Sequence, residues 1–321
     1  MQANRTGKQH FSRRDFLRCA GAAGMGAVAA PRFAGAQEGA ARRPNILLIY
    51  VDDMGYGDVS CYNEDAWIET PAIDKLAADG VRFTQGYVTA PVCFPSRAGL
   101  MTGAYQQRWG NYQNDQAEVM PPETQIVMPA ALRAAGYTTG MTGKWNNVSG
   151  DPDQHFDETH HATKWGSNYF KTGRKSLLNW GPENPTDQYT TDLLTDAACD
   201  FIERRKDETF FFYLAYHAPH SPFRAKQEHQ ERVAHLPTEP QRVYAAMCLA
   251  IDEGIARVMK TLEDNGLAED TMVVFVSDNG PARGGPGLRG YREEWPEMIM
   301  GQTGPLSGHK GTLMGTPAWK R

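Results

Sequence analysis

The chain has 321 residues, of which 40% are hydrophobic and 22% are charged. This composition supplies one large domain or two ordinary ones with a core, and it excludes a fibrous or disordered protein. The net charge is −5, but the first 36 residues hold six Lys or Arg and one Asp, which leaves −10 for the remainder. An acidic body argues against nucleic acid as the main partner.

The first 36 residues predict an export signal. Arg13 and Arg14 stand close to Phe16, and a run of small apolar residues over 20–30 leads to Ala34-Gly35-Ala36. This pattern resembles a twin-arginine signal with a cleavable end, which implies the twin-arginine translocase as a partner and a periplasmic or secreted protein. The alternative is a buried helix with a basic start, and the paired arginines argue against it. We predict a signal peptide over 1–36 and a linker over 37–43.

Four cysteines remain after the leader, namely Cys61, Cys93, Cys199 and Cys248. They lack the CxxC spacing of a metal site and imply no disulfide framework, although a single disulfide among them is possible. Beyond the leader, no segment approaches the ~18 to 20 uninterrupted apolar residues of a membrane span.

The first part of the main domain predicts alternating strands and helices. Residues 44–51 form a continuous apolar run, which is typical of a strand buried on both faces. Thr70-Pro71 offers an N-cap and a first helical residue for a helix that stops at Gly80. Residues 81–88 predict an edge strand, and residues 98–101 suit a short helix.

The same alternation continues along the chain, and it implies an α/β fold with a mainly parallel sheet. We expect helices over 128–135, 193–202 and 243–262, and strands over 137–142, 210–214 and 272–276. We interpret 147–185 as an irregular insertion that shapes a substrate cleft. Residues 281–321 are rich in Gly, Pro, Arg and Met and show no clear periodicity.

Three of the predicted strands end in polar clusters: Asp52-Asp53, His217 with His220, and Asp278-Asn279. In open α/β sheets, ligands bind outside the carboxyl ends of the strands. Three carboxylates and an amide are hard oxygen ligands, so they predict Ca²⁺ or Mg²⁺ rather than zinc. A single Asp at a strand end is more often a turn or helix cap, but two such clusters together favour a metal site.

The sequence Cys93-Phe94-Pro95-Ser96-Arg97 places a lone thiol and a cation at a predicted helix start. Free backbone N–H groups there favour negative charge, and Arg97 adds to this effect. Such a site suits an anionic substrate group or an activated nucleophile. Most single cysteines are small buried hydrophobes, which is the competing interpretation.

Five motifs in order resemble the type I, formylglycine-dependent sulfatase family of the alkaline phosphatase superfamily, and the resemblance runs from Pro44 to Leu313. It implies an alkaline-phosphatase-like sandwich whose central, mainly parallel sheet is flanked by helices. Residues 44–321 would be the N-terminal catalytic domain. The motifs are Cys93-Phe94-Pro95-Ser96-Arg97, Gly136-Tyr137-Thr138-Thr139 with Gly143-Lys144-Trp145, Ala218-Pro219-His220-Ser221-Pro222, Ser277-Asp278-Asn279-Gly280 and Gly308-His309-Lys310-Gly311-Thr312-Leu313.

The resemblance implies a sulfuric ester hydrolase whose nucleophile is made from Cys93. A formylglycine-generating or equivalent maturation enzyme would oxidise Cys93 to formylglycine (3-oxoalanine), and the hydrated aldehyde would attack the sulfur of a sulfate monoester. Its second hydroxyl lets the covalent sulfate intermediate collapse back to the aldehyde. The substrate would be a sulfated carbohydrate or an aryl sulfate, either a small molecule or a polysaccharide.

The resemblance also assigns roles to the other site residues. Arg97 would hold the modified side chain, Lys144 and Lys310 would contact the sulfate oxygens, and His220 would act near the leaving oxygen. One divalent cation, Ca²⁺ in preference to Mg²⁺, would be bound by Asp52, Asp53, Cys93, Asp278 and Asn279. Transfer of a sulfate group needs such cations around its spread negative charge. Taken singly, Lys144 and Lys310 have the competing interpretation of surface lysines, and His217 that of a neighbour.

The chain departs from the family pattern at two places. Asn146 stands where the second family signature commonly has a histidine, and an amide cannot shuttle a proton near neutral pH. Family members usually continue past the Lys310 region with a Glu-Gly-Gly segment, further strands and a smaller domain. We therefore expect a C-terminal part to be missing, with marginal stability or aggregation as its consequence.

Two alternatives remain open from the sequence. One is a phosphomonoester or phosphonate ester hydrolase that uses the same modified residue. The other is a catalytically impaired protein that binds sulfated ligands, which Asn146 and the abrupt terminus favour. Substrate identity and oligomeric state are not indicated.

Overall fold

The computed structural model describes residues 43–116, 119–122, 124–146, 148, 150–163, 188–286, 288 and 291–312. The predicted signal peptide, the linker up to residue 42 and the chain from Leu313 onward lie outside these residues. Most of the predicted insertion over 147–185 lies outside them too, from residue 164 onward.

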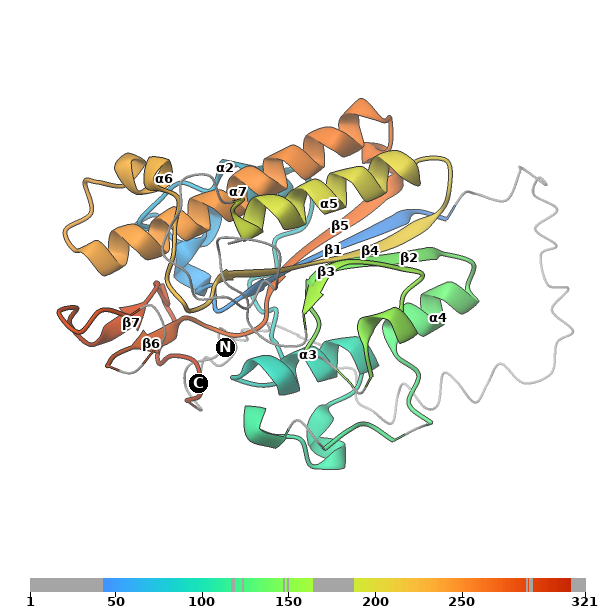
Figure 1. Cartoon of the computed structure of the whole chain (residues 1–321), viewed down its shortest axis with the longest axis horizontal. Helices are drawn as coiled ribbons and strands as arrows, with labels where there is room; N and C mark the ends of the chain where they lie inside the picture. Colours follow the sequence, from blue (N-terminus) through green and yellow to red (C-terminus); the bar gives the residue numbers. More distant parts are fainter. Residues whose placement is uncertain are drawn as a thin grey trace, which may run out of the picture. The chain divides into compact units, whose positions relative to one another are not determined.

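A parallel sheet of five strands occupies the middle of the described chain (Figure 1). Its order is β3-β2-β4-β1-β5, so the first strand in sequence lies between the fourth and the fifth. The apolar runs of β1 and β4 are buried along nearly their whole length, as predicted for strands covered on both faces. The strands are β1 (Asn45–Asp52), β2 (Thr138–Lys144), β3 (Glu158–Thr163), β4 (Phe210–Pro219) and β5 (Thr271–Ser277).

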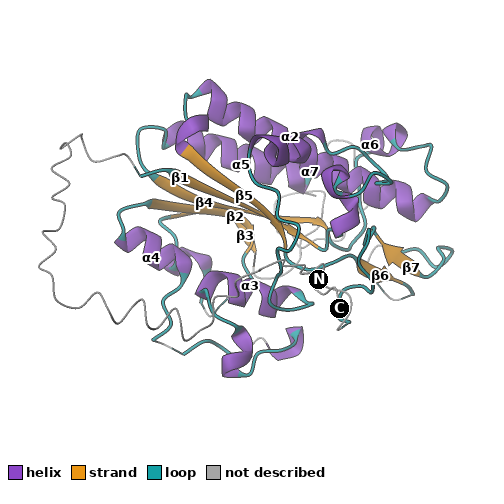
Figure 2. Cartoon of the chain, turned by 180° about the vertical axis from the view of Figure 1, so that it is seen from behind, coloured by secondary structure: helices purple, strands orange, loops and turns teal. Residues whose placement is uncertain are grey.

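Helices cover both faces of the sheet, which confirms the predicted α/β fold (Figures 1 and 2). One face is covered by α2 (Pro71–Asp79), α5 (Thr190–Arg204), α6 (Gln227–Arg232) and α7 (Glu239–Asp264). The opposite face carries α3 (Cys93–Thr102) and α4 (Met128–Ala134). Short 3-10 helices are η1 (Tyr56–Asp58), η2 (Ser60–Tyr62), η3 (Gln106–Trp109), η4 (Asn114–Gln116), η5 (Pro152–Gln154) and η6 (Ala268–Asp270).

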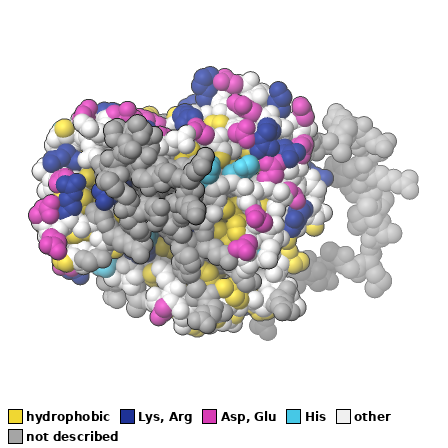
Figure 3. All heavy atoms as spheres, viewed as in Figure 1, with side chains coloured by type: hydrophobic (Ala, Val, Ile, Leu, Met, Phe, Trp, Pro, Cys, Tyr) yellow, Lys and Arg dark blue, Asp and Glu magenta, His cyan; other side chains and the backbone are white. Residues whose placement is uncertain are grey.

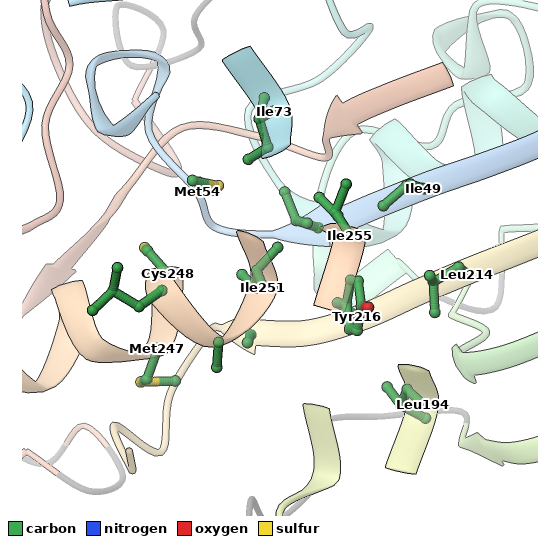
Figure 4. Packing of buried hydrophobic residues seen from close by; sticks show 14 of the residues in the cluster. Ile49, Met54, Ile73, Leu194, Leu214, Tyr216, Met247, Cys248, Ile251 and Ile255 are labelled. Atoms are coloured by element: carbon green, nitrogen blue, oxygen red, sulfur yellow. The ribbon is translucent and has the colours of Figure 1, made fainter. Parts of the chain in front are cut away.

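The larger part of the core lies between the sheet and α7. Ile251 and Ile255 of α7 face Ile49 of β1 and Leu214 of β4, and all four side chains are fully buried (Figure 4). This packing follows from the apolar stripe that predicted the helix. Because β1 and β4 are anchored by these contacts, their carboxyl ends are held at fixed positions.

The start of α2 differs from its prediction in one detail. Thr70 makes no capping bond to the first turn. Instead the carboxylate of Asp252, from α7, accepts the backbone N–H groups of Ala72 and Ile73 at 3.0 to 3.2 Å. A partner distant in sequence thus satisfies the free N–H groups that every helix start presents.

The predicted edge strand over 81–88 is wrong. The segment contains a turn and forms no strand, and the side chains of Val81 and Phe83 are 77% and 69% exposed. Its alternating apolar residues match a strand pattern, but a strand also needs a neighbour for its backbone groups. The sequence of the segment alone carries no information about that neighbour.

Four elements were not predicted from the sequence. β3 lies inside the predicted irregular insertion and pairs in parallel with β2 at the edge of the sheet. Within the region without periodicity, β6 (Ala282–Gly284) and β7 (Met298–Met300) form a small antiparallel pair. α6 is a single short helix. Edge strands and three-residue strands lack the apolar runs that marked the central strands.

The surface shown in Figure 3 carries basic and acidic side chains that are intermingled rather than separated into patches. Cys61, Cys93, Cys199 and Cys248 are all free thiols, so no disulfide links them. Within the described ranges, every helix is too short or too polar to cross a membrane.

Candidate active site

The polar residues predicted at the strand ends meet at one edge of the sheet. Asp52 is the last residue of β1, Lys144 is the last residue of β2, and Asp278 directly follows β5. Because the strands are parallel, their carboxyl ends point in the same direction. The three side chains are 0% to 4% exposed, so the site is buried.

Asp53 occupies the turn after β1 in an unusual backbone conformation. Its φ is 70°, in the left-handed region, which costs an L-residue other than glycine roughly 1 to 2 kcal/mol. Its backbone N–H donates to Asp278 Oδ1 at 3.1 Å. A strained residue at a sheet edge is a frequent sign of function, because the surrounding fold must hold it in place.

Cys93 begins α3 and faces Asp52 at the end of β1 and Asp53 in the turn that follows. Its Sγ lies 3.3 Å from Asp52 Oδ1 and 3.9 Å from Asp53 Oδ1, and the residue is 1% exposed. Burial, reinforced by the charges of Asp278 and Asp52, raises the pKa of the Cys93 thiol far above its ordinary value. The unmodified side chain is therefore a protonated thiol at neutral pH and a weak nucleophile.

Arg97 lies one turn along α3 and is fully buried. Its Nε donates to Asp278 Oδ2 at 2.9 Å, one Nη donates to Tyr213 Oη at 3.1 Å, and the guanidinium lies 4.9 Å from the ring centroid of Tyr50. Burial and the negative charge of Asp52 raise the pKa of Asp278, whereas Arg97 opposes the shift. Arg97 thus neutralises a carboxylate that would otherwise be unpaired in the core.

Two lysines from distant segments complete the ring of charges. Lys144 Nζ lies 2.5 Å from Asp52 Oδ2, and Lys310 Nζ lies 2.6 Å from Asp53 Oδ1 and 2.9 Å from Cys93 Sγ. Burial disfavours both ammonium groups, but the neighbouring carboxylates outweigh it and raise the pKa of each lysine. For Asp52, burial is likewise outweighed by Lys144, and its pKa falls well below its ordinary value. Both lysines carry charge beside the thiol.

The histidines of the β4 end occupy different positions. His220 Nε2 lies 3.6 Å from Asp53 Oδ2, within the cluster, and burial followed by the charge of Lys310 lowers its pKa. His217 Nε2 lies 3.0 Å from Thr163 Oγ1, and burial with the charge of Lys144 lowers its pKa to about 3. His217 is therefore neutral at physiological pH.

Asn146 follows β2, two residues beyond Lys144, and is 9% exposed. It belongs to the same edge of the sheet as the charged cluster. The structure thus brings the sequence-predicted residues to one strand-end region.

The residues around Asp53 fit a divalent cation. Asp52, Asp53, Cys93 and His220 each offer a ligand atom within 4.8 Å of the others. Asn279 Nδ2 donates to Asp53 Oδ1 at 2.6 Å, while its buried Oδ1 has no hydrogen-bond partner among the described residues. An orphaned amide oxygen beside buried carboxylates is the donor set that a hard cation prefers.

Two buried residues at this edge were not predicted to support the site. Tyr244 of α7 lies 3.2 Å from the backbone oxygen of Asp53 and 2.6 Å from Asp58 Oδ2. A tyrosine on an amphipathic helix looks like an ordinary core residue. The sequence signal that was available is Asp58 itself, an acid between two short apolar stretches close behind Asp53.

Comparison with known proteins gives one consistent result. Residues 44–311 match the model of the Sulfatase family. The chain is 30% identical to the uncharacterized sulfatase YdeN of Escherichia coli (strain K12), with 78% of this chain and 55% of that protein covered. It is 31% identical to arylsulfatase A of Homo sapiens, with 75% and 53% covered.

The fold also agrees with solved structures. The crystal structure of Ps i-CgsB matches with a TM-score of 0.69 and 31% identity, over 86% of this chain and 64% of that chain. The chain spans about half the length of the curated relatives it matches. On the match over 44–311 and the shared fold, the chain belongs to the sulfatase family within the alkaline phosphatase superfamily.

Proposed function

We propose that the protein is a sulfuric ester hydrolase that cleaves a sulfate monoester with a nucleophile made from Cys93. The observation that carries this proposal is the position of Cys93 Sγ, 3.3 Å from Asp52 Oδ1 and 2.9 Å from Lys310 Nζ at a buried helix start. Family membership over 44–311 supports it.

The environment of Cys93 favours a modified side chain over a thiol. A thiol whose pKa is raised by burial stays protonated, and a sulfated thiol has no second hydroxyl through which to expel sulfate. A formylglycine hydrate at the same position supplies a hydroxyl nucleophile in place of the thiol. It also has the second hydroxyl through which sulfate can be expelled. We therefore propose that a maturation enzyme converts Cys93 to formylglycine before the protein is active.

The charged side chains around Cys93 suit the transfer of an anionic group. Lys144 and Lys310 present two ammonium groups to the space beside Cys93. Arg97 fixes the start of α3 through its hydrogen bond to Asp278. Such preorganised cations stabilise the charge that develops on the equatorial oxygens in the transition state. We propose that the two lysines contact the sulfate oxygens.

The carboxylates and the amide oxygen of the cluster suit a divalent cation, for which we propose Ca²⁺. Asp52, Asp53, Asp278 and Asn279 would hold it together with the modified Cys93. When bound, such a cation lowers the pKa of a hydroxyl nucleophile and orients it. His220 lies 3.6 Å from Asp53, and we propose that its ring acts near the leaving oxygen.

The relatives narrow the substrate class that we propose. Those at 30% identity or more include arylsulfatase A and several N-acetylgalactosamine-6-sulfatases. Ps i-CgsB has a crystal structure in complex with k-i-k-neocarrahexaose. We propose a sulfated carbohydrate as the substrate, with aryl sulfates as convenient probes, and export through the twin-arginine translocase to the periplasm or the medium.

The test is to measure hydrolysis of nitrophenyl sulfate and nitrophenyl phosphate by protein produced together with a formylglycine-generating enzyme. The mass of the peptide that contains Cys93 reports the modification. We expect turnover of the sulfate ester that exceeds that of the phosphate ester, and loss of both in Cys93→Ala. Cys199→Ala is the matched control, since Cys199 is a free thiol on α5 outside the site. Turnover by Cys93→Ala equal to that of the control would refute the proposal.

A further inference from the structure

The left-handed turn at Asp53 is held by groups from three distant parts of the chain. The side chain of Asp53 is engaged by Lys310 and Asn279, and its backbone N–H donates to Asp278. Its backbone oxygen receives a hydrogen bond from Tyr244 Oη at 3.2 Å. The first three contacts are made by residues of the charged cluster, whereas Tyr244 belongs to α7 and lies outside that cluster.

Tyr244 is placed to act on Asp53 together with Asp58. Its hydroxyl lies 2.6 Å from Asp58 Oδ2, so one hydroxyl hydrogen is shared between that carboxylate and the Asp53 backbone oxygen. The ring is 1% exposed and packs edge-on against Trp67, with 6.2 Å between the ring centroids. The ring is therefore held in place by burial and by its contact with Trp67.

Asp58 joins this hydroxyl to two backbone segments. Its Oδ2 also accepts the N–H of Gly55 at 2.7 Å, and its Oδ1 accepts the N–H of Gln302 at 2.8 Å. The segments touch so closely that a Cβ on Gly301 would lie 2.5 Å from Tyr244 Oη. Both carboxylate oxygens of Asp58 are thus engaged in hydrogen bonds.

We propose that Tyr244 and Asp58 are positioning residues that hold the Asp53 turn in its left-handed conformation, so that the Asp53 carboxylate faces Cys93. The proposal rests on the proposed function, because it takes Asp53 as a ligand of the divalent cation. Asp58 also fixes Gln302, eight residues before Lys310. The pair therefore connects the two chain segments that bring Asp53 and Lys310 together.

This role predicts a specific loss in cation affinity. Tyr244→Phe removes the hydroxyl and leaves the ring against Trp67, so the turn loses its hydrogen bond but keeps its packing. Supporting hydrogen bonds behind a metal ligand typically contribute about 10- to 100-fold in metal affinity. We expect Tyr244→Phe to weaken Ca²⁺ binding by about tenfold or more, and Asp58→Asn to weaken it at least as much.

The matched control is Tyr216→Phe. Tyr216 is a fully buried tyrosine of β4 whose hydroxyl lies 2.7 Å from Thr195 Oγ1, on the side of the sheet covered by α5 and α7. Its removal also deletes a buried hydroxyl, so it costs stability in the same way. A purely structural role for Tyr244 would make the two variants alike in both stability and Ca²⁺ affinity.

The experiment is calorimetric titration of the full chain with Ca²⁺, combined with thermal unfolding of the same samples without the ion. The proposal expects weaker Ca²⁺ binding in Tyr244→Phe and Asp58→Asn, and unchanged binding in Tyr216→Phe at a similar loss of stability. Equal Ca²⁺ affinity in wild type and Tyr244→Phe would overturn the positioning role alone. Absence of Ca²⁺ binding in the wild type would overturn both this role and the proposed cation site.

Discussion

The buried carboxylates of the site are each paired with a cation from another part of the chain. Asp52 pairs with Lys144 and Asp278 with Arg97, at 2.5 and 2.9 Å. Pairing matters because removing one partner of a buried ion pair costs about 3 to 5 kcal/mol. The pairs join residues 92 and 181 positions apart, so they form only when the sheet is complete.

Substitution of Asn146 is a direct test of which group moves the proton during turnover. In protein that carries formylglycine, we expect Asn146→His to raise the rate of nitrophenyl sulfate hydrolysis by about tenfold or more, because an imidazole can take up and release a proton whereas an amide cannot. Asn146→Gln, which keeps the amide, is the control. No change in turnover on introducing the histidine would mean that another group already moves the proton.

Among the elements, β3 is tied to α5 by a small ion-pair network. Glu158 of β3 accepts hydrogen bonds from Arg204 at 2.9 Å and from Arg205 at 2.7 Å. Burial alone would raise the pKa of Glu158, but the two arginines outweigh it and lower the pKa from 4.5 to about 2. A depressed pKa means that the ionised form favours the folded state.

The pH dependence of this network has a definite sign. Its stabilisation is fully present above the ordinary pKa of 4.5 and is lost as the pH falls towards about 2. We expect Glu158→Gln to lower the free energy of unfolding by about 1 kcal/mol at pH 7, and by less at pH 3. Urea unfolding of both proteins at the two pH values measures this difference, with Glu203→Gln on the exposed face of α5 as the control. A gap that stays constant between pH 7 and pH 3 would contradict the assignment.

The sequence predicted those elements whose own residues form an apolar run or an apolar stripe. β1, β4 and β5 carry apolar runs, so all three strands were found, although β4 extends five residues past its predicted end, and α7 shows its apolar stripe. β3 could not be found, because an edge strand with the sequence Glu-Thr-His-His-Ala-Thr has no apolar run and is specified by its partner. The segment 81–88 shows the reverse case, an alternating pattern without a partner.

The same distinction applies to the site. The aspartates after β1 and β5 and the thiol at a helix start were indicated by the ends of predicted elements. Lys144 and Lys310 look like surface lysines in the sequence, and only the resemblance to sulfatases singled them out. Tyr244 was missed because its role depends on a contact 191 residues away.

On the scale of the whole molecule, the outer edge of β5 combines an unpaired backbone with an exposed apolar side chain. This strand pairs with β1 on one side, and within the described chain no strand pairs with its other side. Met272 of β5 is 50% exposed. An unpaired apolar edge is a template for association with another chain.

We expect Met272→Lys to reduce the concentration-dependent association of the protein while changing the free energy of unfolding by less than about 0.5 kcal/mol. Light scattering over a range of protein concentrations measures the association. Ile126→Lys, at a 67% exposed position away from the sheet edge, makes the same charge change and is the control. Equal reduction by both variants would assign the effect to net charge and not to the edge.

The order of strands in the sheet also determines when each strand can pair with its neighbours during synthesis. β1 ends at residue 52, but its neighbour β4 begins only at residue 210. At ~5 to 20 residues per second, the ribosome needs roughly 10 to 30 s to make the intervening chain. Cys93 is made after β1, so at the same rate roughly 6 to 23 s pass between its synthesis and the start of β4. During that time the thiol, which is 1% exposed in the finished fold, lacks the neighbours that enclose it. For the modification that we propose at Cys93, the available time is thus set by how late its neighbours are made.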